Sequence, residues 1–460
     1  MPPASSSATT SDDSSMRDRG DACPGALRLH SADDGALARV RIPAGILTGR
    51  QARALADAAE RLGDGRLDIT SRGNIQLRGL GDDCGGELAA LLDGVGLLPA
   101  PRHERVRNIV ASPLSGLDAA HLANGTGRTD VLPWAMSLDR FLCASETATA
   151  LSGRFLFAFD DGHQDVAALG ADVTVWARPD GQALIRIGDD PDALRIPAKD
   201  AARAALLAAE VFLAVSGNGG TRAWRVRELV DPDHLFALSA SQFARRLAAA
   251  GITAEQHSAA PSGPTSMPQP GIVAGSDERS ALSVVAPLGR LTSAQWRLLA
   301  TVATQLGADE LRVTPWRGVV LPGLPTAGAP GVLSELAEAG LITDTASPWW
   351  GVGACTGLPG CAKSLTDVRA EAAATAAAGH GGLPVYWSGC ARRCGHPPGT
   401  AWVDVVAAAS DGYDVFGPGA TGRRSVPTAE IADAVAAART PSAPSPQTAS
   451  PAQTAPPAQR

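Results

Sequence analysis

The residues best suited to chemistry are four cysteines that stand in two pairs. Cys355 and Cys361 have five residues between them, and Cys390 and Cys394 have three. Zinc sites favour gaps of two to four residues within a pair, so the first gap is unusual for zinc. Iron–sulfur clusters bind four thiolates and tolerate many spacings. The pairs favour a [4Fe–4S] cluster, while a zinc site and buried free thiols stay open as alternatives.

Small residues surround both pairs. The neighbouring glycines are Gly351, Gly353, Gly357, Gly360, Gly389 and Gly395. The sulfides of a cluster need hydrogen bonds, and glycine lets a backbone N–H group approach them closely. The remaining cysteines, Cys23, Cys84 and Cys143, have no partner at ligand spacing, and we expect them to be small apolar or inert side chains.

The part of the chain that precedes these cysteines contains an internal repeat. Residues 41–80 match residues 285–324 without a gap, and sixteen of the forty positions are identical. Each copy contains Thr-x-x-Gln, a capping box that begins a helix. Each helix is followed by a glycine, Gly63 or Gly307, which is expected to end it in a left-handed conformation. A short β-rich stretch follows. The repeat predicts two halves around a pseudo-two-fold axis, with a ligand between them.

The rest of the chain divides around this repeat, and an α+β fold with antiparallel sheets is expected. The segments are a disordered leader (1–24), a first half-domain (25–98), an α+β domain for an anion or ring ligand (99–255), a linker (256–271), a second half-domain (272–335), a cysteine-bearing α/β domain (336–438) and a disordered tail (439–460). The chain of 460 residues carries a formal net charge of −7. That charge argues against general nucleic-acid binding. No apolar run reaches the ~20 residues of a membrane span. The first residues do not resemble a secretory signal, and the clustered cysteines favour the cytosol, where disulfides are rare, so a cytoplasmic protein is expected.

Cysteine spacings of C-x5-C and C-x3-C behind a duplicated half-domain resemble the sulfite/nitrite reductase superfamily. That superfamily couples a [4Fe–4S] cluster to a tetrapyrrole site. The segment "DITSRGNIQLRG" resembles its T-x-R-x-x-x-Q stretch, with Arg72 and Gln76 in place. The segment "RVRNIVASP" resembles its second Arg-Asn stretch, at Arg107 and Asn108. The resemblance implies two ferredoxin-like half-domains plus two α/β domains, one of which carries the cluster.

A third stretch departs from the reductases. They carry two lysines where this chain has "RFLFAFDD", so Arg154 keeps one charge and Leu156 replaces the other. Sulfite and nitrite need dense positive charge, because a buried anion without partners is costly. The loss of one cation therefore counts against these anions as substrates. Asp160 and Asp161, which follow, are expected to form a solvated turn.

The segments "ACTGLPGCAKSLTDVR" and "WSGCARRCGHP" are most similar to the precorrin-3B synthase branch of the superfamily. This implies an oxygen-dependent monooxygenase that hydroxylates precorrin-3A and closes a γ-lactone in aerobic cobalamin synthesis. Arg72, Gln76, Arg107, Asn108 and Arg154 would then bind the carboxylates of the macrocycle. The four cysteines would hold the cluster.

The resemblance also implies NADH as the indirect reductant, through an electron-donor protein. Whether siroheme, a mononuclear iron or neither adjoins the cluster stays open. His396, two residues after Cys394, is the candidate for that iron or for a residue just outside its ligands. A siroheme-dependent sulfite or nitrite reductase and a non-catalytic electron carrier are the alternative functions.

Overall fold

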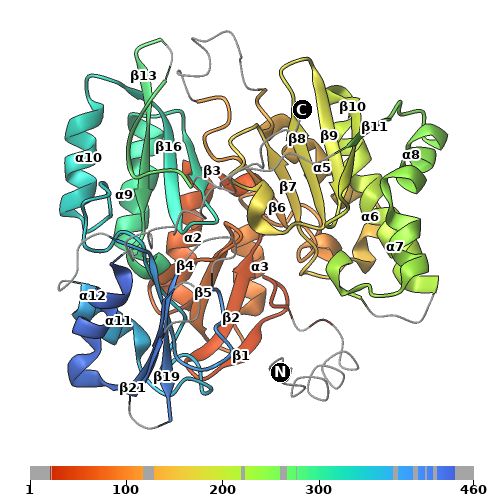
Figure 1. Cartoon of the computed structure of the whole chain (residues 1–460). Coiled ribbons are helices and arrows are strands. Elements are labelled where there is room, and N and C mark those ends of the chain that lie inside the picture. Colours follow the sequence, from red (N-terminus) through yellow and green to blue (C-terminus); the bar gives the residue numbers. More distant parts are fainter. Residues whose placement is uncertain are drawn as a thin grey trace, which may run out of the picture.

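The computed structural model describes residues 21, 23–117, 129–218, 223–258, 267–275, 277–376, 382–396, 402–409, 412–417 and 422–440. Most of the expected leader and tail, and the middle of the expected linker, lie outside these residues. Four sheets make up the described part of the chain. Figure 1 shows the two half-domains together, the β6–β11 sheet on one side of them and the C-terminal sheet below.

The two half-domains contain the same elements in the same order. The first has β1 (His30–Ala32), β2 (Gly35–Val40), β3 (Ile46–Thr48), α2 (Gly49–Leu62), β4 (Arg66–Ile69), β5 (Ile75–Leu80) and α3 (Gly85–Asp93). The second has β12 (Gly271–Ala274), β13 (Arg279–Val285), β14 (Arg290–Thr292), α9 (Ser293–Gln305), β15 (Glu310–Val313), β16 (Gly318–Pro325) and α10 (Ala329–Glu338). The capping boxes that begin α2 and α9 are both formed, as predicted.

The halves are joined by an exchange of short strands. The sheet orders are β1-β2-β5-β4-β14 and β12-β13-β16-β15-β3, so each sheet ends in a strand from the other half. Helices α2 and α9 pack together, and the Trp296 indole N–H donates to the Ala52 carbonyl at 2.8 Å. Ala52 and Trp296 occupy equivalent positions in the repeat. The predicted two-fold axis is confirmed and passes close to this pair.

The expected left-handed helix ends are wrong at both glycines. Gly63 is extended, with φ −123° and ψ −156°, and Gly307 is not among the residues with positive φ. The left-handed residues lie two positions further on, at Gly65 (φ 75°) and Asp309 (φ 55°). Their N–H groups bond back to the helix, at the Ala59 and Ala303 carbonyls. The chain reverses there because the next strand must return along the helix.

The other two sheets are mixed, so the expectation of antiparallel sheets is wrong for them. One contains β6 (Ile109–Ala111), β7 (Phe157–Asp160), β8 (Val173–Ala177), β9 (Gln182–Ile187), β10 (Asp192–Pro197) and β11 (Glu255–Ser258), with helices α5 (Leu132–Ala144), α6 (Ala201–Asn218), α7 (Pro232–Leu238) and α8 (Ala240–Ala249). Strands β6, β7 and β8 run parallel. The connections before β7 and β8 are long enough for crossovers, which parallel pairing requires.

The fourth sheet carries the cysteine pairs. It contains β17 (Val352–Ala354), β18 (Val385–Ser388), β19 (Val403–Ala408), β20 (Gly412–Phe416) and β21 (Gly422–Pro427), with helices α11 (Val368–Ala376) and α12 (Ile431–Arg439). Strands β17, β18 and β19 are parallel. Within the described residues, no helix is both long and apolar enough to cross a membrane.

Candidate functional site

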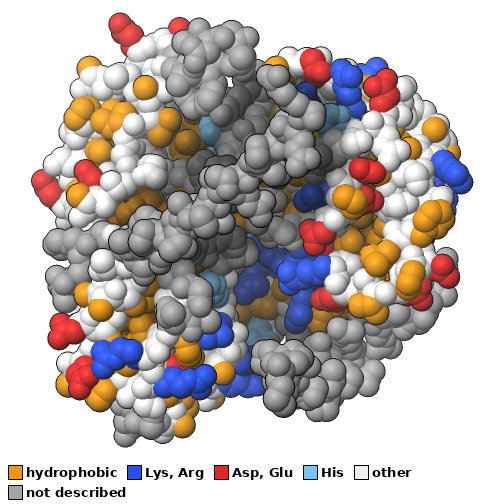
Figure 2. Space-filling view, in the orientation of Figure 1, with side chains coloured by type: hydrophobic (Ala, Val, Ile, Leu, Met, Phe, Trp, Pro, Cys, Tyr) orange, Lys and Arg blue, Asp and Glu red, His pale blue; other side chains and the backbone are white. Residues whose placement is uncertain are grey.

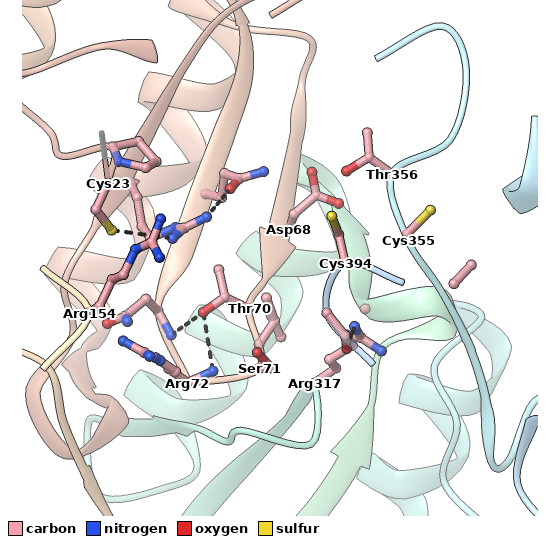
Figure 3. A pocket seen from close by; sticks show the side chains of 18 of the residues that line it. Cys23, Asp68, Thr70, Ser71, Arg72, Arg154, Arg317, Cys355, Thr356 and Cys394 are labelled. Atoms are coloured by element: carbon pink, nitrogen blue, oxygen red, sulfur yellow. Dashed lines mark hydrogen bonds between the residues drawn. The ribbon is translucent and has the colours of Figure 1, made fainter. Parts of the chain in front are cut away.

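A cavity of about 510 Å³ lies where both half-domains meet the two other sheets. Its wall takes residues from the β4–β5 turn, from the loops beside β7 and after α6, from the second half-domain and from the cysteine-bearing loops. Figure 3 shows Arg72, Arg154 and Cys23 on one side of it, and Cys355 and Cys394 on the other. The volume falls within the ~300–1,000 Å³ of small-molecule and cofactor sites.

The cavity is strongly cationic. Among the described residues, its wall carries eight arginines and two acidic residues. The arginines are Arg39, Arg41, Arg72, Arg154, Arg225, Arg227, Arg317 and Arg369, and the acids are Asp68 and Glu228. Lys and Arg side chains also gather around the central hollow of the face in Figure 2. Such an excess of positive charge favours a ligand with several negative charges.

Burial increases the electrostatic cost of holding these positive charges without an anion. Burial and the nearby Arg41 charge lower the pKa of Arg39 to about 10. Burial, with the charges of Arg225 and Arg41, lowers the pKa of Arg72 to about 9. Both groups are still protonated at neutral pH, so the folded chain holds positive charges that destabilise one another. An anionic ligand would offset that repulsion.

Strand alternation places the cations. In β2, Ala38 and Val40 point into the core of the half-domain. Because side chains alternate along a strand, Arg39 and the adjoining Arg41 lie on the opposite face. Arg39 donates to Gln76 Oε1 at 2.9 Å, across the β2–β5 ladder. Gln76 thus lines the cavity where the sequence placed it. Arg39 and Arg41 were missed, although the alternation in "LARVRI" could have revealed them.

Two of the predicted arginines also reach the cavity. Arg72 lies in the β4–β5 turn, and its Nη1 is 3.5 Å from the Gly153 carbonyl. Arg154 lies at the rim, with 39% of its side chain exposed and its guanidinium 4.3 Å from the centre of the Trp224 ring. A role of either residue in binding carboxylates stays a prediction.

Arg107 and Asn108 are placed differently from the expectation. Arg107 is buried, bonds both oxygens of Asp139 at 2.7 and 2.8 Å, and donates to the Leu97 carbonyl. Asn108 is buried too, donates to the Gly153 carbonyl and accepts from Asn74 at 3.1 Å. Neither residue lines the cavity. The expectation that Arg107 faces it is wrong, because the carboxylate on α5 already satisfies the guanidinium.

Cys23 is a cavity residue that sequence reasoning did not identify. Its sulfur lies 3.2 Å from Arg41 Nη2 and 3.9 Å from Arg39 Nη1, and it donates to the Gly153 carbonyl at 3.6 Å. It precedes the first strand, where no periodicity marks the facing side. Cys84 and Cys143 do not line the cavity. Burial raises the pKa of both thiols, which keeps them protonated and unreactive.

The four paired cysteines come from neighbouring strand ends. Cys355 follows β17 and the second pair follows β18, and these two strands are parallel neighbours. The Gly389 N–H donates to Cys355 Sγ at 3.2 Å. Burial raises the pKa of Cys394; Arg392 lowers it, and charges on the other three cysteines raise it further. The loops that bear the two pairs therefore meet at the same edge of this sheet.

Their spacing bears on the kind of metal. Within the described residues, no group of three or more His, Cys, Asp or Glu is close enough to hold one metal ion. The thiolates of a cubane cluster each bind a different iron, and the glycine N–H donor at Cys355 Sγ is the kind of hydrogen bond that a cluster sulfur needs. The [4Fe–4S] ligation by the four cysteines stays a proposal, and the zinc alternative stays open.

The polar faces of the half-domains hold the cysteine loops in place. Arg78 pairs with Asp34 and donates to the Gly360 carbonyl at 2.5 Å, beside Cys361. The Ala362 N–H donates to Asp33 on the other side of that cysteine. Arg369 bridges Asp68 of the half-domain, at 3.0 Å, and the Cys355 carbonyl, at 3.2 Å. Both ends of the first pair are therefore fixed.

His396, Asp160 and Asp161 do not line the cavity, and the role of His396 at or beside an iron stays a prediction. His396 Nε2 lies 3.1 Å from Asp404 Oδ1, and His396 does not line the cavity. Asp160 and Asp161 are buried, so the expected solvated turn is wrong. Asp160 accepts from the N–H groups of Gly162 and Gln164 and so shapes the loop.

Comparisons with known proteins agree with this architecture. Residues 30–93 and 274–339 match the nitrite/sulfite reductase ferredoxin-like half domain. The chain belongs to the sulfite/nitrite reductase superfamily. A ferredoxin–nitrite reductase of Synechococcus elongatus is 28% identical over 389 residues, which are 78% of this chain and 74% of that protein. A precorrin-3B synthase of Sinorhizobium sp is also 28% identical, over 404 residues, 86% of this chain and 83% of that protein.

The fold of the superfamily is shared as well. The NirA protein of Mycobacterium tuberculosis superposes with a TM-score of 0.65 at 17% identity, over 86% of this chain and 79% of that chain. The superfamily uses siroheme and a [4Fe–4S] cluster, and the named relatives are oxidoreductases. The predicted fold class is confirmed, and an oxidoreductase role is supported.

Proposed function

We propose that the chain is a precorrin-3B synthase. It would hydroxylate precorrin-3A with dioxygen and form a γ-lactone, using a [4Fe–4S] cluster held by Cys355, Cys361, Cys390 and Cys394. The observation that supports this most directly is the arginine-lined cavity with Cys355 and Cys394 on its wall. The precorrin-3B synthase relative, which matches 86% of the chain, supports the same substrate.

The charge of the cavity is the argument for a polycarboxylate ring. Precorrin-3A carries acetate and propionate groups around its edge, and an arginine fork binds a carboxylate with two parallel hydrogen bonds. The eight arginines come from four parts of the fold: Arg39, Arg41 and Arg72 gather around Cys23 and Gly153, whereas Arg317 and Arg369 bond the cysteine-bearing loops. A ring with carboxylates on several sides matches that distribution better than a single small anion does.

Four residues of the cavity wall would then have defined roles in binding. Arg72 and Arg39 would bind carboxylates inside the cavity, with Gln76 orienting Arg39. Arg154, stacked on Trp224, would close the rim. The cluster would supply single electrons, delivered by a donor protein that draws on NADH. Together the arginines would hold the macrocycle so that the carbon to be hydroxylated faces the side of the cavity that bears Cys394.

The second candidate function is a siroheme-dependent nitrite or sulfite reductase. The observation in its favour is the nitrite reductase relative, which is as similar in sequence as the synthase. Against it stands Leu156, at the position where the reductases have a lysine. Leu156 is buried and packs against Val110 and Ala158, so it contributes no charge to an anion pocket.

Two measurements on the same purified sample test the proposal. The first is an anaerobic count of iron, sulfide and bound tetrapyrrole. The second is turnover of precorrin-3A with a reductant, with and without dioxygen, followed by mass spectrometry for the added oxygen. We expect four irons, four sulfides and an oxygen-dependent product. Bound siroheme with six-electron reduction of sulfite or nitrite would assign the chain to the reductases.

A further inference from the structure

Arg317 has an unusual backbone conformation for its residue type. Its φ is 62°, in the left-handed region that side chains with a Cβ avoid. It lies in the turn between β15 and β16, where its N–H donates to the Thr314 carbonyl at 3.1 Å. Thr314 accepts a second bond, from the Gly318 N–H to its Oγ1 at 3.1 Å. The turn is therefore well determined and holds Arg317 in this conformation.

The first half-domain shows what this turn normally requires. The equivalent position is Gly73, whose φ is 65° and whose N–H donates to the Thr70 carbonyl at 3.0 Å. The Asn74 N–H donates to Thr70 Oγ1 at 3.1 Å, as Gly318 does in the other copy. The two turns have the same hydrogen bonds, and one uses the residue that fits without strain. Arginine at 317 thus costs free energy that glycine does not, which indicates a role for its side chain.

The side chain is half-buried and directed toward the second cysteine pair. Gly289, Gly353 and Gly395 surround it; a Cβ at Gly353 would lie 3.0 Å from Arg317 Nη1, and a Cβ at Gly289 would overlap the arginine stem. Arg317 Nη2 donates to the Gly395 carbonyl at 3.2 Å and to the Tyr386 hydroxyl at 3.3 Å. The same hydroxyl donates to the Cys394 carbonyl at 2.8 Å. Figure 3 shows Arg317 beside Cys394 at the cavity wall.

Among the described residues, the charge of Arg317 has hydrogen-bond partners but no acidic partner. Among the described residues no carboxylate forms an ion pair with Arg317. The guanidinium instead lies 5.3 Å from the centre of the Tyr386 ring. A positive charge at this place stabilises negative charge added next to it, and the electron taken up by a cluster is such a charge.

We propose that Arg317 is a positioning residue that fixes the Cys394–Gly395 turn and makes the cluster easier to reduce. The first cysteine pair is fixed by Arg78 of the first half-domain, and Arg317 does the corresponding work for the second pair from the second half-domain. This inference rests on the part of the proposed function that assigns the cluster to the four cysteines. It does not depend on the substrate.

The test compares three full-length variants purified without oxygen and titrated with dithionite. Arg317→Gly leaves the turn unstrained, since Gly73 already occupies the equivalent position, and it removes the charge. Its cluster should bind the added electron about tenfold less favourably, which is a reduction potential about 59 mV more negative. Arg317→Lys keeps the charge and should shift the potential less, with an altered electron paramagnetic resonance spectrum of the reduced cluster.

Asp309→Gly is the matched control, because Asp309 (φ 55°) also replaces a glycine of the first copy, and its carboxylate bonds Gly49 and Thr304 and none of the cysteine loops. Its potential should equal that of the wild type. A cluster-loaded Arg317→Gly protein with the wild-type potential and spectrum would overturn the role of Arg317 alone. Wild-type protein that binds no iron and sulfide would overturn the cluster assignment as well. Loss of precorrin-3A turnover alone bears on the substrate and leaves this inference standing.

Discussion

Replacing Arg72 by glutamine should stabilise the free protein while weakening its ligand binding. Arg72 has no carboxylate partner among the described residues, and its side chain makes one long hydrogen bond, to Gly153 at 3.5 Å. Burial and the neighbouring arginines lower its pKa from the ordinary arginine value to about 9. At 1.36 kcal/mol for each pKa unit, this corresponds to a cost of at most about 5 kcal/mol at neutral pH.

The measurable gain should be smaller than that limit. Water and counterions in the cavity reduce the repulsion, and glutamine loses the contact with Gly153. We expect Arg72→Gln to raise the free energy of unfolding by roughly 0.5–2 kcal/mol, as is typical when a strained functional group is removed. A charge-assisted pair with a carboxylate contributes about 1.5–3 kcal/mol, so the dissociation constant for precorrin-3A should rise about ten- to a hundred-fold.

The assay is urea unfolding of the cluster-loaded chain without oxygen, between pH 7 and pH 10. The folded state holds the Arg72 proton less tightly than the unfolded state, so its charge destabilises the fold at neutral pH. That penalty begins to fade as the pH rises past the folded pKa of about 9 and disappears only above the higher pKa of the unfolded state, so the difference between the two proteins should narrow by pH 10. Arg297, exposed and paired with Asp57 and Glu60, is the control, and Arg297→Gln should change stability by less than about 0.5 kcal/mol. An Arg72→Gln protein less stable than the wild type at pH 7 would refute the reasoning.

Three further substitutions separate structural from functional groups. Arg107→Ala should cost about 3–5 kcal/mol of stability, because it leaves the buried Asp139 carboxylate without its partner; unchanged urea unfolding would contradict the buried pair. Cys390→Ser should abolish the cluster absorption and the iron and sulfide content, whereas full cluster content would remove Cys390 from the ligand set. Burial, with the charges of Asp160 and Asp161, raises the pKa of Asp165 to about 7. The stability from its protonated form should therefore be lost as the pH rises through 7, and Asp165→Asn should flatten the unfolding midpoint between pH 5 and pH 8.

The sequence predicts the repeat well because both copies satisfy the same local demands. The capping residues and the apolar helix faces are each set by a few neighbouring residues, and they recur at one spacing of 244. The arginines of the cavity are less predictable. Arg107 and Arg72 are both arginines in matching family stretches, yet an aspartate 32 positions after Arg107 decides that it is a structural residue. The pairing of Arg107 with this aspartate can be recognised only once the position of α5 in the fold is known.

The parallel strands and Cys23 escaped prediction for a similar reason. Whether β6, β7 and β8 pair in parallel depends on how the connections cross the sheet, which short apolar runs do not reveal. Cys23 lies before the first strand, and it is brought to the cavity by contacts with Gly153 and Arg41, which are far away in the sequence. Both features depend on long-range geometry.

The exchange of β3 and β14 has a consequence for how this chain folds. Neither half-domain can complete its own sheet, so the last strand of each must arrive from a segment more than 200 residues away. Until the second half is synthesised, β4 presents an open edge that can recruit a strand from another molecule. A fragment that ends before residue 274 should therefore aggregate or require a chaperone, and supplying residues 267–340 in trans should rescue it. If one half once folded as a separate protein, the same exchange would have made it a dimer of identical chains.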